Sequence, residues 1–233
     1  MLKLVVYPPH FGEPSASPFS VKALCLLQQS GLAHEVERIN DPRKAPKQKL
    51  PMLLDGDRVV PDSDQIRDYL EQKTGIDFDE GLSPEQRAAS RAVIRMLEEH
   101  VYFAILCDRW MHDGNWERIK AAFFSEIPAL MRGLVTRQIR KQVAAQAHAQ
   151  GMGRHSDGER FERIRKDIDA VTALVGDKPF LFGEAPKAAD LSAVAVLRAA
   201  LAAPVPTETS RYIAQDARLM AYLERGREAL YPA

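Results

Sequence analysis

The sequence predicts a protein in two parts, an α/β part at the N-terminus followed by an all-helical part. Strand-like and helix-like periodicity alternate over about the first 75 residues, whereas apolar residues recur only at helical spacing from Pro84 onward. A chain of 233 residues also buries about 70–75% of its unfolded surface, so it needs no metal or disulfide to fold. We place the α/β part at residues 1–78 and the helical part at residues 83–233.

The first strand, the first helix and the second strand follow one another closely. Leu2–Tyr7 is largely apolar, as in a short buried strand, and a loop rich in Pro, Gly and Ser follows at Pro8–Pro18. Phe19–Ser30 carries apolar residues at helical spacing and stops before Gly31, a residue typical of helix C-termini. His34–Ile39 alternates as a strand does.

The rest of the α/β part predicts a hairpin and a second helix. Asn40–Lys49 is polar and contains two prolines, so we expect a loop or a broken helix. Pro51–Leu54 and Arg58–Val60 flank an Asp-Gly-Asp sequence, which favours a β-hairpin. Asp62–Thr74 has a helical pattern that ends at Gly75. The order strand, helix, strand, loop, hairpin, helix is the thioredoxin-like arrangement.

Helical spacing dominates the second part. The segment Lys187–Ala203 is apolar almost all round, which is typical of a helix inside a bundle. The predicted helices of this part are Pro84–Met111, Trp116–Ala149 with an interruption near Pro128, Glu159–Val175, Lys187–Ala203 and Tyr212–Leu230.

Composition excludes several classes of function. The 32 Lys and Arg residues balance 32 Asp and Glu residues, whereas a protein whose main partner is nucleic acid carries a basic surface. Cys25 and Cys107 make no disulfide framework, and the six histidines show no metal-binding spacing, so we expect no metal. Without a signal peptide or an apolar run of roughly 20 residues, the sequence predicts a cytoplasmic protein with no transmembrane segment.

Four local motifs resemble the glutathione transferase superfamily. They are Ser17-Pro18-Phe19, Lys49-Leu50-Pro51, Asp62-Ser63 and the stretch GDKPFLFGEAPKAADLSAVAVL at residues 176–197. Within that superfamily, residues 81–110 and 151–161 resemble the failed-axon-connections branch, which is related to metaxins. The resemblance covers nearly the whole chain. It implies a transferase fold with glutathione as co-substrate, a small electrophile bound between the two parts, and a homodimer.

The resemblance implies that Ser17 stabilises the thiolate of glutathione. Lowering a thiol pKa from about 8.5 to about 6.5 requires roughly 2.7 kcal/mol. A hydrogen bond to a charged group contributes about 1.5–3 kcal/mol and a helix N-terminus about 0.3–1 kcal/mol, so the sum suffices. The alternative is that Ser17 only caps its helix. Tyr7, at the end of the first strand, is the rival thiolate partner, and Ser15 is a third choice.

The resemblance also assigns the residues that bind the rest of glutathione. A cis bond before Pro51 would turn the backbone of Leu50 toward the peptide, the alternative being an ordinary proline at a strand entry. Ser63 and Asp62 would hold the γ-glutamyl end, unless they only cap a helix. The implied glutathione-binding residues are Ser17, Phe19, Lys49, Leu50, Pro51, Asp62 and Ser63.

One segment departs from the family pattern. Only about ten residues separate Ile39 from Leu50, so the usual second helix is shortened or absent. Lys47 or Lys49 would then hold the glycine carboxylate of glutathione. The short segment favours a second hypothesis, a non-catalytic binding or adaptor protein of the metaxin-like type, over an enzyme.

The helical part offers three further expectations. Tyr102, Phe103 and Trp110 could line the electrophile pocket, although an aromatic stripe on a long helix is more often core. In a capping box before the buried helix, Asp190 would supply the acid, but Lys187 has no acceptor for the other half. Five Lys or Arg residues and no acidic residue occur between residues 132 and 155. We expect a solvated helix face there, with a membrane or anion-binding patch as the alternative.

Overall fold

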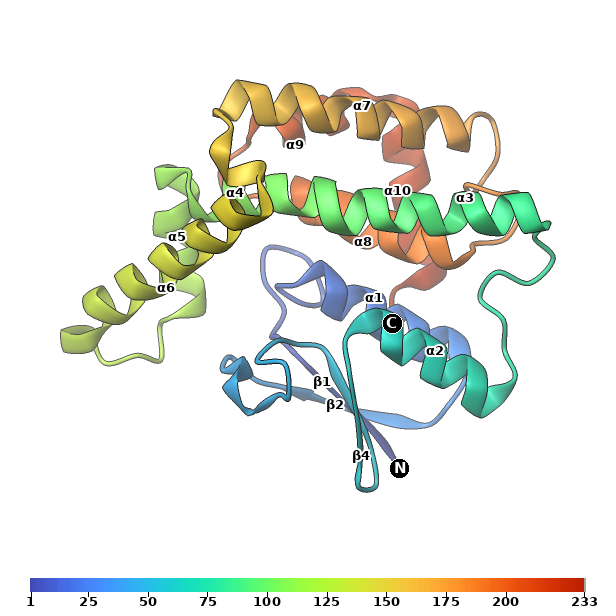
Figure 1. The fold of residues 1–233 in the computed structure, drawn as a ribbon, viewed down its shortest axis with the longest axis horizontal. Coiled ribbons are helices and arrows are strands. Elements are labelled where there is room, and N and C mark those ends of the chain that lie inside the picture. Colours follow the sequence, from blue (N-terminus) through green and yellow to red (C-terminus); the bar gives the residue numbers. More distant parts are fainter. Residues whose placement is uncertain (233) are drawn as a thin grey trace.

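The computed structural model describes residues 1–232, and its N-terminal part is a four-stranded mixed sheet with two helices (Figure 1). The sheet order is β2-β1-β3-β4, with β1 and β2 parallel and β3 antiparallel to both β1 and β4. This topology confirms the predicted thioredoxin-like arrangement. The elements are β1 (Leu2–Val6), α1 (Pro18–Ser30), β2 (His34–Arg38), β3 (Met52–Asp55), β4 (Arg58–Pro61) and α2 (Ser63–Thr74).

The two faces of the sheet are covered differently. Helices α1 and α2 lie between the sheet and the helical part (Figure 1), and alternate residues of β1 join the main hydrophobic core. On the other face, Val5 packs with Ala45 and Leu50 in a second, small cluster. Segment 39–50 contains one short 3₁₀ turn, η1 (Pro42–Lys44), as expected for a loop or broken helix. A loop therefore covers this face.

The C-terminal part is helical throughout the described residues. The predicted helix Pro84–Met111 is a continuous helical path through α3, a π-helical segment η2, and α4. The predicted interruption near Pro128 separates α5 from α6. The elements are α3 (Pro84–Arg95), η2 (Met96–Val101), α4 (Tyr102–Trp110), α5 (Asp113–Phe123), α6 (Ala129–Gln150), η3 (Met152–Arg154), α7 (Asp157–Val175), α8 (Ala188–Leu201), α9 (Glu208–Gln215) and α10 (Ala217–Leu230).

One helix prediction was wrong. We predicted a single helix over Tyr212–Leu230, but the chain forms two helices that meet at Asp216. The backbone of Asp216 is extended (φ −88°, ψ 100°), and its carboxylate accepts hydrogen bonds from the N–H groups of Arg218 and Leu219, both at 3.0 Å. A side-chain acceptor that can cap a new helix lets the chain change direction there.

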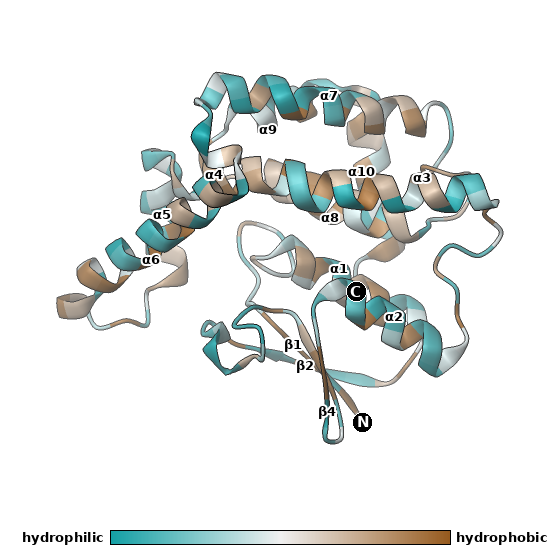
Figure 2. Ribbon diagram, in the orientation of Figure 1, coloured by the Kyte–Doolittle hydropathy of each residue, from teal (hydrophilic) through white to brown (hydrophobic). Residues whose placement is uncertain are grey.

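Helix α8 is the centre of the helical part, as its apolar sequence predicted, and Figure 2 shows predominantly hydrophobic colour along it. Asp190 is buried, and its carboxylate accepts hydrogen bonds from Leu181 N (2.9 Å), Lys187 N (2.8 Å) and the Tyr222 hydroxyl (2.8 Å). Lys187 caps nothing with its side chain, and Nζ instead donates to the carbonyl of Glu80 at 2.6 Å. Half of the predicted capping box is present.

Candidate functional site

Ser17 stands at the N-cap position of α1, and its hydroxyl is uncommitted. The backbone is extended (φ −112°, ψ 128°), yet the side chain does not cap the helix, and no acidic residue occupies the first turn. The residue is half-buried, and its hydroxyl forms no hydrogen bond with any other residue between 1 and 232. The capping alternative for Ser17 is therefore not observed. A hydroxyl and a helix N-terminus remain available to a ligand at this point.

Ser15 and Tyr7, the other two candidates, belong to the same loop. The hydroxyl of Ser15 donates to the carbonyl of Tyr7 (2.9 Å) and accepts from the backbone N–H of Ser17 (3.4 Å). Ser15 is buried, so its hydroxyl anchors the loop. Burial raises the pKa of Tyr7 to about 12, and the neighbouring Tyr102 and Asp41 add to this effect. The phenol of Tyr7 is therefore neutral near pH 7 and can act as a hydrogen-bond donor.

A buried arginine that the sequence reasoning missed lies behind this loop. Arg109 is 8% exposed; one guanidinium nitrogen donates to the carbonyl of Ala16 (3.0 Å) and the other to that of Ala199 (2.7 Å). Within the described chain it forms no ion pair, and its Nε is buried without a partner. Burial lowers the pKa of Arg109, but an arginine keeps its charge at any ordinary pH. A guanidinium without an ion pair in residues 1–232 therefore binds the backbone of the residue before Ser17.

The sequence held one weak signal for Arg109. It follows Tyr102 by seven residues, which places both on one face of the helix. Tyr102 contacts Phe19 at the start of α1, with ring centroids 4.7 Å apart in an edge-to-face arrangement. A helix face that touches α1 through Tyr102 presents the arginine to the adjacent loop.

The three aromatic residues predicted for the electrophile pocket have different surroundings. Tyr102 contacts Phe19, as described above, whereas Phe103 packs against the main core. Trp110 belongs to an aromatic cluster with Phe123. The ring centroid of Phe123 lies 4.7 Å from that of His10, which belongs to the loop between Tyr7 and Ser17. The loop and the α4–α5 region are thus in direct contact near Ser17.

The Leu50–Pro51 peptide bond is cis, as predicted. Leu50 is buried, and its backbone N–H and C=O form no hydrogen bond within the described residues. The carbonyl of Pro51 accepts from the N–H of Asp62 at 3.2 Å, which ties this turn to the start of α2. Lys49 is exposed. The turn therefore presents two unpaired backbone groups next to the start of a helix.

Asp62 and Ser63 divide two roles at the start of α2. Asp62 has a left-handed backbone (φ 72°), and its carboxylate caps the helix by accepting from the N–H of Asp64 at 2.9 Å. Ser63 is only 2% exposed, and its hydroxyl has no partner among residues 1–232. The capping alternative holds for Asp62 but not for Ser63.

An ion cluster next to Ser63 joins the two parts of the protein. Asp64 accepts from Lys22 of α1, and from Arg91 and Arg95 of α3, each at 2.7 Å. Burial opposes ionisation of Asp64, but the three cations outweigh it and lower its pKa to about 2. Glu98 and Glu99 complete the cluster. Glu98 binds Lys22 at 2.7 Å and Arg95 at 2.5 Å, and Glu99 binds Arg95 at 3.2 Å.

The cluster is balanced in charge. Its three cations face three carboxylates. Sequence reasoning missed the cluster, although Lys22 was a visible anomaly inside the apolar run Val21–Leu27. Lys22 is 1% exposed, so its charge had to find carboxylates on other elements.

The loop that was expected to bind the glycine carboxylate of glutathione is exposed to solvent. Lys47 and Lys49 are both exposed. With the amide of Gln65 oriented to donate to Pro61 O (3.1 Å), its oxygen accepts from Lys47 Nζ at 2.8 Å. Lys47 therefore lies beside the first turn of α2.

Two domain families match this sequence. The description "Glutathione S-transferase N-terminal domain" matches residues 18–115, and "Glutathione S-transferase, C-terminal domain" matches residues 164–226. An isoprene-epoxide–glutathione S-transferase from Rhodococcus sp. (strain AD45) is 32% identical over 98% of both chains.

Two other relatives are longer proteins. Failed axon connections of Drosophila melanogaster is 30% identical over 79% of this chain and 46% of its own length. Metaxin-1 of Mus musculus is 24% identical over 84% of this chain and 64% of its own length. The chain thus spans about half to two thirds of these two proteins.

Solved structures share the fold. A glutathione transferase from Phanerochaete chrysosporium superposes with a TM-score of 0.66 at 14% identity, covering 100% of this chain and 98% of that one. A glutathione S-transferase of Ceriporiopsis subvermispora, in complex with glutathione, has a TM-score of 0.65 at 14% identity, with the same coverage.

Proposed function

The chain belongs to the glutathione transferase superfamily, and from that premise we propose that it conjugates glutathione to a small electrophile. The observation that carries the proposal is the uncommitted hydroxyl of Ser17 at the start of α1, backed by the unpaired cation of Arg109. Each feature favours a negative charge on a ligand bound beside the loop that ends at Ser17. A glutathione thiolate is the anion that the reaction requires there.

In this proposal, glutathione lies across the starts of α1 and α2. Its γ-glutamyl carboxylate binds the hydroxyl and N–H of Ser63 at the start of α2, where a helix N-terminus favours an anion. Asp62 faces the γ-glutamyl ammonium group. The unpaired backbone groups of Leu50 bind the middle of the peptide in the manner of an added strand. Phe19, Lys49 and Pro51 complete the contacts that the family pattern assigns.

Ser17 and Arg109 both stabilise the thiolate, by different interactions. The hydroxyl of Ser17 donates a hydrogen bond to the sulfur, which contributes about 1.5–3 kcal/mol when the acceptor is charged. The guanidinium of Arg109 acts through the Ala16 carbonyl that it binds and through its field. A cation in a partly buried site interacts more strongly than one in bulk water. Together they favour release of the thiol proton to solvent.

The neutral phenol of Tyr7 suits a second step when the electrophile is an epoxide. The thiolate forms a carbon–sulfur bond, the carbon–oxygen bond breaks, and the electron pair leaves on an alkoxide. That alkoxide must take up a proton. With a pKa of about 12, Tyr7 keeps its proton near pH 7 and is still a stronger acid than an alcohol. We therefore assign Tyr7 to the oxygen of the electrophile and Ser17 to the sulfur.

The competing function is a non-catalytic binding or adaptor protein. The short segment 39–50 favours it, since the glycine end of glutathione has only an open loop to bind, and so do the failed axon connections and metaxin-1 relatives. Such a protein would not turn over any electrophile.

Calorimetric titration with glutathione, followed by turnover assays, separates the two functions. We expect binding below millimolar ligand, and turnover of both a small epoxide and an aryl halide. Tyr7→Phe should slow the epoxide reaction and spare the aryl halide reaction, because a leaving halide needs no proton. Ser125→Ala, an exposed loop position, serves as the control. Failure to bind glutathione at millimolar concentration would exclude the transferase. Binding with no turnover of either substrate would favour the adaptor.

A further inference from the structure

The first half of α6, residues 129–141, projects from the body of the protein (Figure 1). We call this segment the α6 arm. Its first turns carry three apolar side chains that are largely exposed: Leu130 at 98%, Met131 at 57% and Leu134 at 76%. Elsewhere in the described residues, the exposed large apolar side chains are Met1 and Val59. The apolar tip of the α6 arm is thus a concentrated patch, which is typical of a surface that meets a partner.

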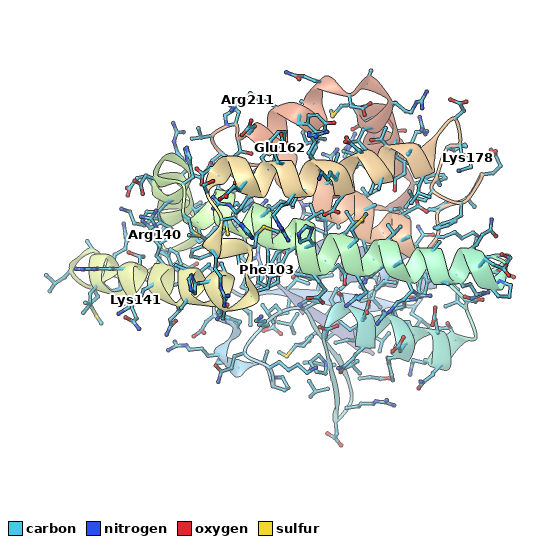
Figure 3. All side chains as sticks on the ribbon, turned by 45° about the horizontal axis from the view of Figure 1, so that its top comes forward. Phe103, Arg140, Lys141, Glu162, Lys178 and Arg211 are labelled. Atoms are coloured by element: carbon cyan, nitrogen blue, oxygen red, sulfur yellow. The ribbon has the colours of Figure 1, made fainter. Side chains whose placement is uncertain are left out.

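Cations follow this tip along the same face of the helix. Leu130, Leu134, Arg137 and Lys141 are spaced by four, three and four residues, so they form one stripe. Arg137 and Lys141, together with Arg140, Met111 and Ala144, line a concavity of about 410 Å³. Arg140 and Lys141 are labelled on α6 in Figure 3.

The three cations of the concavity differ in how they are held. Arg140 is fixed by the carbonyls of Trp110 and Met111, both at 2.8 Å, and by Asp113 at 2.7 Å. Arg137 and Lys141 are exposed and form no ion pair within residues 1–232. Two cations next to an exposed apolar tip are therefore available to anionic groups outside the protein.

Charge is segregated between the arm region and the rest of the chain. Residues 127–156 contain five Lys or Arg and no Asp or Glu, whereas the remaining residues contain 27 basic and 32 acidic side chains. Residues 127–156, which contain the α6 arm, carry a net charge of +5 and the remaining residues −5, although the chain as a whole is neutral. An anionic surface would attract the arm and repel the body, which selects one orientation.

We propose that the α6 arm docks peripherally on an anionic lipid surface. Its apolar tip enters the outer hydrocarbon of one leaflet, while Arg137 and Lys141 bind lipid phosphates. The rise from Leu134 to Lys141 is about 10 Å at 1.5 Å per residue, and the polar headgroup layer is roughly 5–7 Å thick on each side. The stripe therefore spans that layer. In the described residues no helix is long and apolar enough to cross a bilayer, so the contact is peripheral.

A second copy of the chain fits the tip less well than a bilayer does. Pairing of two tips would place the cationic stripes of both copies against each other, which repels. Docking of the tip elsewhere on a second copy would require an apolar receiving surface. The concavity beside Val59 is lined in large part by polar residues, namely Arg58, Gln65, Asp68 and Gln72. A bilayer needs no such surface on the protein, and the tip projects from the body (Figure 1).

Vesicle sedimentation tests the proposal without any need for turnover. We expect the protein to sediment with phosphatidylcholine vesicles that contain phosphatidylglycerol, and to remain in solution with phosphatidylcholine alone. Binding should fall steeply with salt. Leu130→Ser with Leu134→Ser should weaken it at least tenfold, and so should Arg137→Glu with Lys141→Glu. Both pairs are exposed, so folding should be unaffected.

Two control variants should leave vesicle binding unchanged. Val59→Ser removes an exposed apolar side chain elsewhere, and Arg163→Glu with Lys166→Glu reverses two exposed charges on α7; both variants should bind as the wild type does. Light scattering is recorded on the same samples. Equal binding by all variants, or no binding to anionic vesicles, would overturn the proposal. So would a dimer that dissociates in Leu130→Ser with Leu134→Ser, because the tip would then be an interface between copies.

Discussion

The starts of α1 and α2 differ in how their backbone N–H groups are satisfied. At α2, the carboxylate of Asp62 caps the helix and Asp64 brings three cations from α1 and α3. At α1, the hydroxyl of Ser17 caps nothing and the first turn has no acid. The start of α2 is stabilised from within the protein, whereas the start of α1 is left for an anion to complete.

Substitutions at the two helix starts should therefore have different effects, one on stability and the other on turnover. Removing a charged group at α2 should cost stability, because buried cations lose their partner. Removing the hydroxyl of Ser17 should lower turnover and leave stability unchanged, because this hydroxyl makes no hydrogen bond within the described residues.

Asp64→Ala should lower the free energy of unfolding by about 3 kcal/mol, because it leaves the buried Lys22 with Glu98 alone, which Lys22 shares with Arg95. Urea denaturation measures the change. Asp68→Ala, an exposed position one turn later on the same helix, is the control and should change the free energy by less than about 0.5 kcal/mol. Equal effects at both positions would show that the ion cluster contributes little to stability.

Ser17→Ala should reduce turnover about ten- to a hundredfold near pH 7, which is the value of one hydrogen bond to a charged acceptor. Its melting temperature should match the wild type, because the hydroxyl makes no hydrogen bond within the described protein. Asp62→Ala, by contrast, should lower stability as well, since loss of a cap costs about 1 kcal/mol. A Ser17→Ala variant that melts lower but reacts normally would reverse the roles given to the two helix starts.

Acid should weaken the ion cluster that joins the two parts of the protein, because it protonates Asp64. The pKa of Asp64 is about 2 in the folded protein, against an ordinary value of 3.8. Because the folded pKa is the lower one, this carboxylate stabilises the fold above about pH 4 and stops doing so as pH falls toward 2. The loss should be about 1–2 kcal/mol after allowance for its partial exposure. Denaturation at several pH values, with Asp64→Asn as reference, measures it. Parallel pH profiles of the two proteins would contradict the assignment.

Lys187→Thr should raise the free energy of unfolding by about 0.5 kcal/mol, since a threonine hydroxyl can accept from the N–H of Asp190. The substitution also removes the contact of Lys187 Nζ with Glu80. Lys187→Val lacks that contact too but has no hydroxyl, so the difference between the two variants isolates the cap. Thermal melts that place threonine no higher than valine would exclude this capping geometry.

Local sequence signals predicted most of the fold. The strand alternation, the hairpin at residues 55–57 and the apolar run of α8 each indicated their element correctly. The cis bond before Pro51 was predicted from the family pattern. The break at Asp216 was missed because a capping acid resembles any polar residue on a helix face. The division at residues 1–78 and 83–233 stays a prediction.

The site was harder to predict, because its charges come from distant parts of the chain. Lys22 and Glu98 are 76 residues apart, and Arg109 is 93 residues from the Ala16 carbonyl that it binds. No local pattern links such pairs. Ser17 and Ser63 were visible because helix starts have a sequence signature, but only the packing shows that neither hydroxyl caps its helix.

The ultraviolet absorbance of the glutathione thiolate, followed against pH with wild-type protein and with Ser17→Ala, shows whether Ser17 stabilises the thiolate. We expect a thiol pKa near 6.5 with the wild type, about two units below the free value of 8.5, and a rise of at least one unit in the variant. A bound thiol that titrates like free glutathione with the wild type, or identically with both proteins, would contradict this expectation.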